Sequence, residues 1–285
     1  MAYTKSMIDL HTHSSASDGS LSPRELIAAA AKRGLTAIAL TDHDTINGLE
    51  DAKAEAERLQ IRFIPGIEID IDRGSPAIPG DFHLLGLNLS RLSPDFVQKV
   101  ASAAKRREER NLLILDKMKE LSIPGEYEEI AAFSGGHSIG RPHFAAFLVS
   151  RHIVKTAEQA FSLYLGKGKP LYVPKTGMNF DDALAIIKAS GGVPVLAHPM
   201  SLYIAWGQLP NYIQNLKERG LEGIEAWHPT ATVRACIRLE MLGKSLGLRI
   251  SAGSDFHGKT RLDRKLGFTA GNRKIEDRFL DVLAT

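Results

Sequence analysis

The sequence predicts an α/β fold, a distorted barrel of seven strands that is related to the (β/α)8 type but is one strand short. Short apolar runs alternate with amphipathic helical patterns over most of the chain, and seven such runs can be counted. A continuous series of helical patterns at residues 93–170 predicts a small all-helical insertion. A doubly wound open sheet is the alternative that the same alternation allows.

The first half of the barrel is expected to hold four strands and two helices. A short apolar run precedes His11, and residues 22–25 form a capping box with proline at the first helical position. Gly34 stands where the C-terminal cap of that helix belongs. The next elements are a buried strand in TAIALTDHD, a helix over residues 48–59, and strands in IRFIPGIEIDI and DFHLLGLNL.

The second half supplies three more strands, in GGVPVLAHP, EGIEAWHP and LRISAGSDFH, each after an amphipathic helix. Between the halves, one long helical pattern begins at Ser93, and shorter ones cover residues 126–133, 142–150 and 157–165. The stretch KRREER is expected to be a solvated helix face, with phosphate contact as the alternative. We therefore expect a barrel of residues 1–92 and 171–285 and an insertion of residues 93–170.

Composition restricts the function classes. The net charge of +3 and pI near 8.9 suit an anionic small substrate and fall short of a surface for duplex DNA. Cys236 is the only cysteine, which excludes an internal disulfide and a thiolate zinc cluster. We find no signal peptide and no membrane span, and we expect a cytoplasmic protein. No G-x-S-x-G elbow occurs, and LGKGKP lacks the P-loop spacing.

Potential metal ligands recur at the ends of the expected strands. In a parallel α/β barrel these C-terminal ends meet at one mouth, where side chains from different strands come together. A single His-x-His pair or strand-end glutamate is more often structural than ligating. The full set at these positions comprises His11, His13, Asp18, His43, Glu68, His83, His198, Asp255 and His257.

Carboxylates gathered at one buried mouth repel one another unless positive charge lies between them. Divalent cations provide that charge. Imidazole and carboxylate ligands without thiolate suit Mn, Fe or Zn better than Ca or Mg. We therefore expect a cluster of divalent transition-metal ions.

The chain resembles the PHP domain family (polymerase and histidinol phosphatase). The motifs DLHTHSSASDG, ALTDHD, PGIEI, FHLLG, LAHP and GSDFH carry the resemblance over roughly residues 8–92 and 170–270. It implies a distorted seven-stranded barrel with three metal ions, for which we favour manganese, and a metal-bound hydroxide in place of a protein nucleophile. The implied ligand sets are His11, His13, Glu68 and Asp255 for one ion, the shared Glu68 with His83 and His198 for a second, and Asp18, His43 and His257 for a third.

The helical insertion, with its segment GRPHFAAFLV, resembles the family branch that dephosphorylates nucleoside 3′,5′-bisphosphates and trims short RNA from the 5′ end. The resemblance implies an insertion that caps the active site and binds substrate through Arg141 and His143, at a helix start whose amide groups favour anions. Helix capping and packing are the alternative roles for both residues. The expected partners are nucleotides, including monophosphates, or short RNA, without duplex DNA or membrane.

Two other functions stay open: a histidinol-phosphate phosphatase, and a non-catalytic, metal-stabilised interaction domain. Asp42 and Asp44 are expected to orient histidines or stabilise a loop. Tyr203 and Trp206 could stack a nucleobase, and packing is equally compatible with the sequence. We expect surface or partly buried positions for His137, His152 and His228, and solvated side chains for Lys169 and Lys175.

Overall fold

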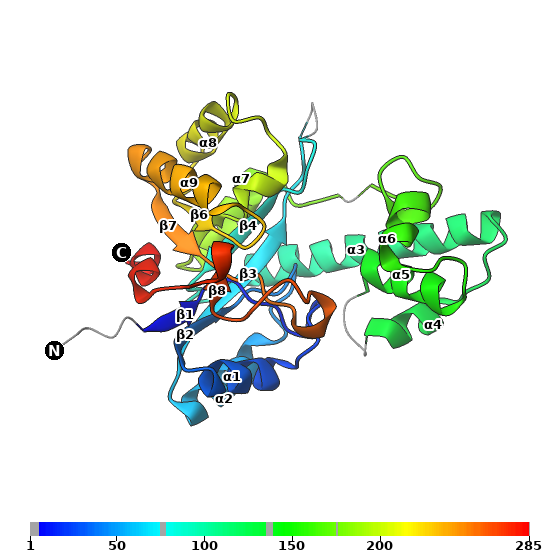
Figure 1. Ribbon diagram of the computed structural model, residues 1–285, viewed down its shortest axis with the longest axis horizontal. Coiled ribbons are helices and arrows are strands. Elements are labelled where there is room, and N and C mark those ends of the chain that lie inside the picture. The colour runs from blue at the N-terminus through cyan, green and yellow to red at the C-terminus, as the bar shows by residue number, and fades with distance from the viewer. Residues whose placement is uncertain (1–5, 75–77, 135–138, 175, 285) are drawn as a thin grey trace. The chain divides into compact units, whose positions relative to one another are not determined.

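The computed structural model describes residues 6–74, 78–134, 139–174 and 176–284 (Figure 1). The chain divides into two compact units. The first unit comprises Met1–Lys99 and Gly177–Thr285, and the second comprises Val100–Thr176. His137 and Lys175 lie outside the described residues.

The first unit contains a sheet of seven strands whose order in space follows their order in the chain. This sequential order confirms the predicted barrel type and excludes the doubly wound sheet, in which the order reverses. The strands are β1 (Met7–Asp9), β2 (Leu35–Leu40), β3 (Arg62–Asp70), β4 (His83–Leu87), β5 (Val193–Leu196), β6 (Gly223–Trp227) and β7 (Arg249–Ala252).

The sheet is nearly closed into a barrel, because hydrogen bonds join the segments that follow its two outer strands, β1 and β7. The N–H of Asp255 donates to the carbonyl oxygen of His11 at 2.9 Å, and the N–H of His13 donates to Phe256 at 2.9 Å. These bonds connect the segments that follow β1 and β7, so both ends of the sheet reach the same mouth.

The expectation of an all-parallel barrel was wrong for β4, which runs antiparallel to both β3 and β5. The reason is the short connection of residues 71–82, whose described residues, 71–74 and 78–82, form no crossover helix to return the chain in the parallel direction. His83 therefore begins its strand instead of ending it. Because β4 is reversed, this N-terminal end lies at the mouth that the other strands reach with their C-terminal ends.

Five helices of the first unit cover the strands, and Figure 1 shows α1 and α2 beside one another on one side with α7, α8 and α9 on the other. The predicted capping box of Ser22 and Glu25 is present at the start of α1, and Gly34 beyond its end has a φ of 81°. The bounds are α1 (Pro23–Lys32), α2 (Leu49–Leu59), α7 (Phe180–Ala189), α8 (Leu209–Glu218) and α9 (Val233–Ser245).

Apolar side chains of α1 and α2 pack on β2. Leu26 and Ile27 of α1 and Ile38 and Leu40 of β2 are fully buried in one cluster. Full burial of such a side chain contributes roughly 1.5 to 3 kcal/mol.

The C-terminal segment adds a two-stranded sheet of β8 (Phe268–Thr269) and β9 (Arg273–Lys274).

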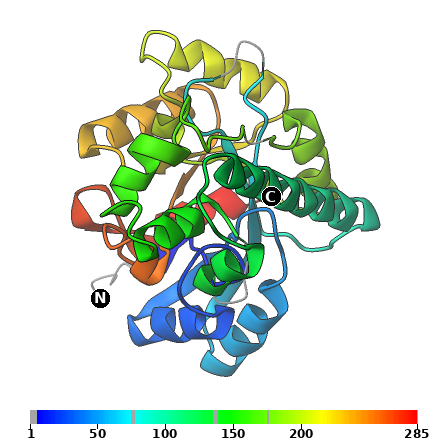
Figure 2. The ribbon, with the colours of Figure 1, turned by 90° about the vertical axis from the view of Figure 1, so that its right-hand side faces the viewer.

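The second unit is helical. The long helix α3 (Pro94–Glu120) begins in the first unit and continues into the second, uninterrupted (Figure 2). The shorter helices are α4 (Tyr127–Ala131), α5 (Arg141–Ser150) and α6 (Ala157–Ala160), which a single helical turn, Phe161–Leu165, extends.

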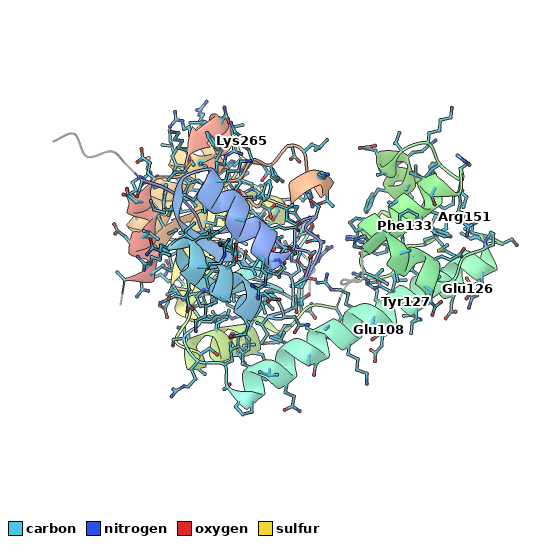
Figure 3. All side chains as sticks on the ribbon, turned by 90° about the horizontal axis from the view of Figure 1, so that it is seen from below. Glu108, Glu126, Tyr127, Phe133, Arg151 and Lys265 are labelled. Carbon is cyan, nitrogen blue, oxygen red and sulfur yellow. The ribbon has the colours of Figure 1, made fainter. Side chains whose placement is uncertain are left out.

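A separate apolar core stabilises the second unit. Its fully buried members include Ile114 and Met118 of α3 and Phe144 of α5, and Tyr127 packs against them. Figure 3 labels Tyr127 and Arg151 on this unit. Arg151 pairs with Glu129 of α4, which connects the end of α5 to α4.

The expectation of a solvated KRREER face holds for Lys105, Glu108 and Glu109, which are exposed. It was wrong for Arg110, which is 6% exposed and donates to the side chain of Asn111 at 3.0 Å. Arg110 lies one turn before Ile114 of the buried core, and residues four apart lie on the same face of a helix. No helix within the described ranges is both long enough and apolar enough to cross a bilayer.

Candidate metal centre

The nine predicted ligands all belong to the first unit. Seven of them are buried, and Asp18 and His43 are half-buried. His11 and His13 share one face of the extended chain after β1, because side chains alternate along it. Thr12 between them points elsewhere and donates its hydroxyl to the carbonyl oxygen of Ala39 at 2.5 Å.

Glu68 lies at the middle of the cluster. Its Oε2 atom is 3.3 Å from Nε2 of His11 and of His13 and 3.0 Å from Nδ1 of His43. Its Oε1 atom is 2.9 Å from Nδ1 of His83 and 2.8 Å from Nε2 of His198. One carboxylate, 0% exposed, therefore faces imidazoles from four different strand ends.

Two aspartates flank this centre. Oδ1 of Asp255 lies 3.5 Å from Nε2 of His11 and 3.3 Å from Nε2 of His13. Oδ1 of Asp18 lies 3.2 Å from Nε2 of His257, and its Oδ2 lies 4.0 Å from Nε2 of His43. The structure thus brings all nine predicted residues into one contiguous cluster.

Four groups of side chains in this cluster could each hold a metal ion, because their ligand atoms lie within 4.8 Å of one another. One contains the three residues that the resemblance assigns to the third ion, with His13 in addition. The groups are His13, Asp18, His43 and His257; His11, His13 and Glu68; His43, Glu68 and His83; and His11, His228 and Asp255.

The carboxylates of the centre are held ionised. Burial raises the pKa of Glu68, but the imidazoles of His43, His11 and His83 outweigh it, so that its pKa lies well below the ordinary value. The pKa of Asp255 is likewise well below its ordinary value, because His257 and His11 outweigh the effect of burial. Buried anions require positive charge within a few ångströms.

The donor atoms also fit a metal. Five buried ring or carboxylate atoms of the described cluster have no hydrogen-bond partner: Nδ1 of His13 and His43, Nε2 of His228 and His257, and Oε2 of Glu68. Unpartnered buried polar atoms are costly. Neutral imidazole nitrogens and carboxylate oxygens at these spacings are the ligands that Zn, Fe and Mn accept, so the residues present fit divalent transition-metal ions.

A hydrogen-bonded loop holds Asp18 near the cluster. Asp42 accepts from the N–H and hydroxyl of Ser14 at 2.8 and 2.6 Å and from the hydroxyl of Ser17 at 2.5 Å. Asp44 accepts from the N–H of Asp70 at 3.0 Å. These contacts confirm that Asp42 and Asp44 stabilise loops around the centre.

The expectation for His228 was wrong. Its side chain is 3% exposed, and Nε2 lies 3.3 Å from Oδ2 of Asp255. His228 directly follows β6, which ends at Trp227, and therefore reaches the same mouth as the other strand-end residues. The signal was available, since the His-Pro pair at 228 repeats the His-Pro pair of His198 at the end of β5.

Three further charged residues near the cluster were missed. Glu225, inside β6, lies 3.0 Å from Nδ1 of His11, and its signal was a charge within a wholly buried strand. Asp70 lies 2.7 Å from Nε2 of His83. Arg264 is buried with Nε 3.6 Å from Asp255, and its loop gives no sequence signal for this contact.

Arg141 and His143 belong to the second unit, in the first turn of α5. Nδ1 of His143 accepts the N–H of Gly140 at 2.9 Å, so His143 acts as a helix cap. The guanidinium of Arg141 lies 5.9 Å from the ring centre of Tyr172. The capping and packing roles are therefore present, and substrate binding by these two residues stays a prediction.

The structure also shows the surroundings of four other residues from the sequence analysis: Tyr203, Trp206, His152 and Lys169. The guanidinium carbon of Arg238 lies 4.1 Å from the ring centre of Trp206. This contact favours the packing role for Trp206. Tyr203 is 75% exposed, and its stacking role stays a prediction. His152 and Lys169 are exposed as expected.

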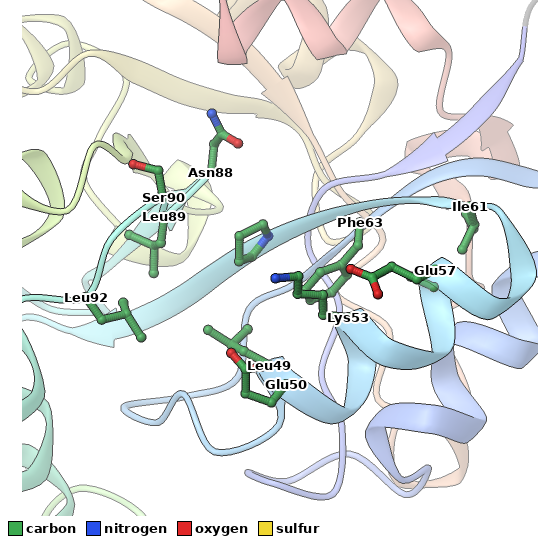
Figure 4. Close-up of a pocket in the computed structure, with 12 residues that line it drawn as sticks. Leu49, Glu50, Lys53, Glu57, Ile61, Phe63, Asn88, Leu89, Ser90 and Leu92 are labelled. Atoms are coloured by element: carbon green, nitrogen blue, oxygen red, sulfur yellow. The ribbon is translucent and has the colours of Figure 1, made fainter.

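A separate pocket of about 640 Å³ lies at the other ends of β3 and β4 (Figure 4). Phe63 and Leu92 contribute apolar surface, Asn88 lies at the end of β4, and the charged ends of Lys53 and Glu57 border it. None of the nine predicted ligands lines it. The histidine cluster and this pocket are therefore distinct features of the first unit.

Comparison with known proteins places this cluster in a family. Residues 9–167 match the model of the PHP domain. The chain is 35% identical over 249 residues to a 5′-3′ exoribonuclease of Haemophilus influenzae, covering 87% of this chain and 89% of that protein. It is 32% identical over 263 residues to a 3′,5′-nucleoside bisphosphate phosphatase of Chromobacterium violaceum, covering 92% and 91%.

A solved structure agrees with the sequence comparison. An amidohydrolase from Chromobacterium violaceum with bound sulfate and no metal superposes with a TM-score of 0.83 at 31% identity, covering 94% of this chain and 92% of that one. With 94% of this chain covered, the match extends over both units. The chain belongs to the PHP domain family.

Proposed function

We propose that the chain is a metal-dependent phosphoesterase that hydrolyses phosphate esters of nucleotides. The observation that carries this proposal is the position of Glu68 between five imidazoles, with Asp18 and Asp255 at its flanks. Relatives that act on phosphate esters, by their names an exoribonuclease and a bisphosphate phosphatase, support the reaction class.

We propose three ions, manganese being favoured over iron and zinc. The ligand sets are those implied by the family: His11, His13, Glu68 and Asp255; Glu68, His83 and His198; Asp18, His43 and His257. Bound divalent cations would neutralise phosphoryl oxygens and make water acidic enough to act as the nucleophile. The shared position of Glu68 supports its assignment to two of these sets.

The side chains around the centre support a reaction without a protein nucleophile. The hydroxyls of Ser14 and Ser17, the nearest alcohols in the loop before Asp18, both donate to Asp42. Asp42 also accepts the backbone N–H of Ser14 at 2.8 Å, so these hydroxyl contacts belong to the hydrogen bonds that fix the loop, and neither hydroxyl pairs with a histidine as an activated nucleophile does. The remaining work of the chain is to position charge and to exclude bulk water around the buried ligands.

For substrates, we propose nucleoside 3′,5′-bisphosphates, nucleoside monophosphates and short RNA trimmed from the 5′ end. We propose Arg141 and His143, in the helical insertion of residues 93–170, as contacts for a substrate phosphate. Arg141 is half-buried in the first turn of α5, and the planar donors of its guanidinium match phosphate oxygens. The cytoplasmic location stays a prediction.

Release of phosphate from a panel of substrates tests this proposal. Protein loaded with manganese is incubated with adenosine 3′,5′-bisphosphate, adenosine monophosphate, a short 5′-phosphorylated RNA, duplex DNA and histidinol phosphate. We expect hydrolysis of the nucleotides and of the short RNA, and none of duplex DNA. Preference for histidinol phosphate would favour that activity instead, and hydrolysis of none by a fully loaded protein would indicate a non-catalytic domain.

A further inference from the structure

Glu225 of β6 joins two histidines that belong to different proposed ligand sets. Its Oε1 atom lies 3.0 Å from Nδ1 of His11, and its Oε2 atom accepts the backbone N–H of His198 at 2.8 Å. The carboxylate is 0% exposed. Each carboxylate oxygen therefore has a hydrogen-bond partner within the protein, at a position that bulk water does not reach.

The contact with His11 fixes that ring. Because Nδ1 faces the carboxylate of Glu225, Nδ1 carries the hydrogen and Nε2 is left as the ligand atom. Nε2 lies 3.3 Å from Oε2 of Glu68 and 3.5 Å from Oδ1 of Asp255. The ring is thus oriented with its free nitrogen toward the two carboxylates of the first proposed set.

The contact with His198 fixes its backbone. His198 has a φ of 27° and a ψ of 66°, a conformation that residues other than glycine adopt only when their surroundings impose it. Glu225 holds the N–H, and the ring nitrogen Nδ1 lies 2.6 Å from the hydroxyl of Ser201. Together these contacts leave Nε2 of His198 2.8 Å from Oε1 of Glu68.

Gly253 provides an independent sign that this arrangement is built into the fold. A Cβ atom at this position would lie 2.6 Å from Oε1 of Glu225 and closer still to Cβ of His11. Both neighbours are buried and cannot move aside cheaply. The glycine two residues before Asp255 therefore makes the room in which Glu225 reaches His11.

We propose that Glu225 is a positioning residue for two of the three ions of the proposed phosphoesterase, acting through His11 and His198. The inference rests on the proposed function for the identity of those ions. In the described chain no contact of Glu225 reaches Asp18, His43 or His257. The third ion is therefore independent of it, which gives the proposal a selective signature.

The substitution Glu225→Gln separates the two contacts. A glutamine side chain keeps the shape, but it has one accepting oxygen and one donating nitrogen. Its oxygen can accept from His11 or from the N–H of His198. The remaining N–H group then faces the amide nitrogen of the glutamine, which is also a donor. Glu55→Gln is the matched control, since Glu55 is a nearly buried carboxylate of α2 that contacts Arg58 and lies outside the cluster.

The experiment is a direct titration of metal-depleted full-length protein with Mn²⁺ against a competing chelator, with no substrate present. For Glu225→Gln we expect affinity for two ions to fall about 10 to 100-fold, the range for residues that orient ligands, while the third keeps wild-type affinity. Glu55→Gln should match wild type at every step. With Co²⁺ as the probe, the visible absorption of the two weakened sites should also change.

Wild-type affinity for all ions in Glu225→Gln would overturn the proposal. So would uniform weakening of all three steps, because that is the effect of a general loss of stability. If the glutamine variant does not fold, Glu225→Asp keeps the charge on a shorter arm that cannot span both contacts, and the same selective pattern is required of it. Because binding is measured without substrate, an inactive chain that binds metal still decides the question.

Discussion

Oε1 of Glu68 lies 2.8 Å from Nε2 of His198, although 130 residues separate the two in the chain. This contact joins β3 to the loop after β5 across the mouth of the sheet. A buried ion pair alone gains little stability, and the position of Glu68 beside this ring supports the shared ligand role that we propose for it.

Glu68→Gln should reduce metal content and hydrolysis together, because the substitution removes a charge that two proposed ions share. Residues that only orient ligands change affinity or activity about 10 to 100-fold, so this direct loss should be larger. Elemental analysis gives the metal content per chain, and phosphate release by the same preparation gives the rate of hydrolysis. Full occupancy with wild-type turnover would refute the shared-ligand assignment.

His228→Gln should weaken hydrolysis through Asp255. The N–H of Thr230 donates to Nδ1 of His228 at 3.2 Å, and Nε2 on the other side of the ring lies 3.3 Å from Oδ2 of Asp255. We expect a loss of about 10 to 100-fold in metal affinity or kcat/KM. His152→Asn, a change at an exposed histidine, is the control, and equal behaviour of the two variants would remove His228 from the centre.

Arg141→Ala tests the proposed substrate contact. A charge-assisted hydrogen bond contributes about 1.5 to 3 kcal/mol, so kcat/KM for a nucleoside bisphosphate should fall roughly 10 to 150-fold through KM, with metal content intact. Substrates with one phosphate should lose less, because the missing contact is to the second phosphate. Arg151→Ala, at the other end of α5, is the control for charge.

Equal losses on both substrate classes would assign Arg141 to the reacting phosphate. No loss on either class, in a folded variant with full metal content, would leave Arg141 with its packing role beside Tyr172 and would weaken the nucleotide assignment.

Glu240 of α9 gives a prediction about stability and pH. Burial raises its pKa, but hydrogen bonds from Arg278, Lys244 and Trp227 outweigh it and lower the pKa to about 2. A lowered pKa in the folded state stabilises the protein fully above the ordinary value of 4.5, and this contribution is lost as pH falls toward 2.

Glu240→Gln should therefore lower the free energy of unfolding by about 1.5 kcal/mol at pH 7, the lower end for bonds to a charged group, since Lys244 and Arg278 are solvent-exposed. The difference should be smaller at pH 3. Urea unfolding at the two pH values measures it, and the same difference at both would contradict the charge-based explanation.

The strand-end histidines could be predicted because their positions follow from local patterns. An apolar run identifies a strand, and the polar residue at its end must reach a rim of the barrel. His11 and Asp255 required no knowledge of which strands pair. The direction of β4 could not be read in this way, since an apolar run has the same pattern in either direction, and only the short connection after Asp70 indicates a hairpin.

Glu225 and Arg264 show the limit of that reasoning. Glu225 lies inside its strand, where a charge is explained only by partners from other parts of the chain, 27 and 214 residues away. Arg264 lies in an irregular loop, and its approach to Asp255 depends on the path of that loop. Such contacts are long-range packing results, which residue types and spacing do not encode.

If hydrolysis depends on ions held by this cluster, metal content and activity must fall and recover together. Metal per chain and phosphate release are determined on the same protein as purified, after exhaustive chelation, and after readdition of Mn²⁺. We predict two to three ions per chain in the purified protein, loss of hydrolysis when they are removed and recovery when Mn²⁺ is added back. Full activity in protein verified to be free of metal would contradict it.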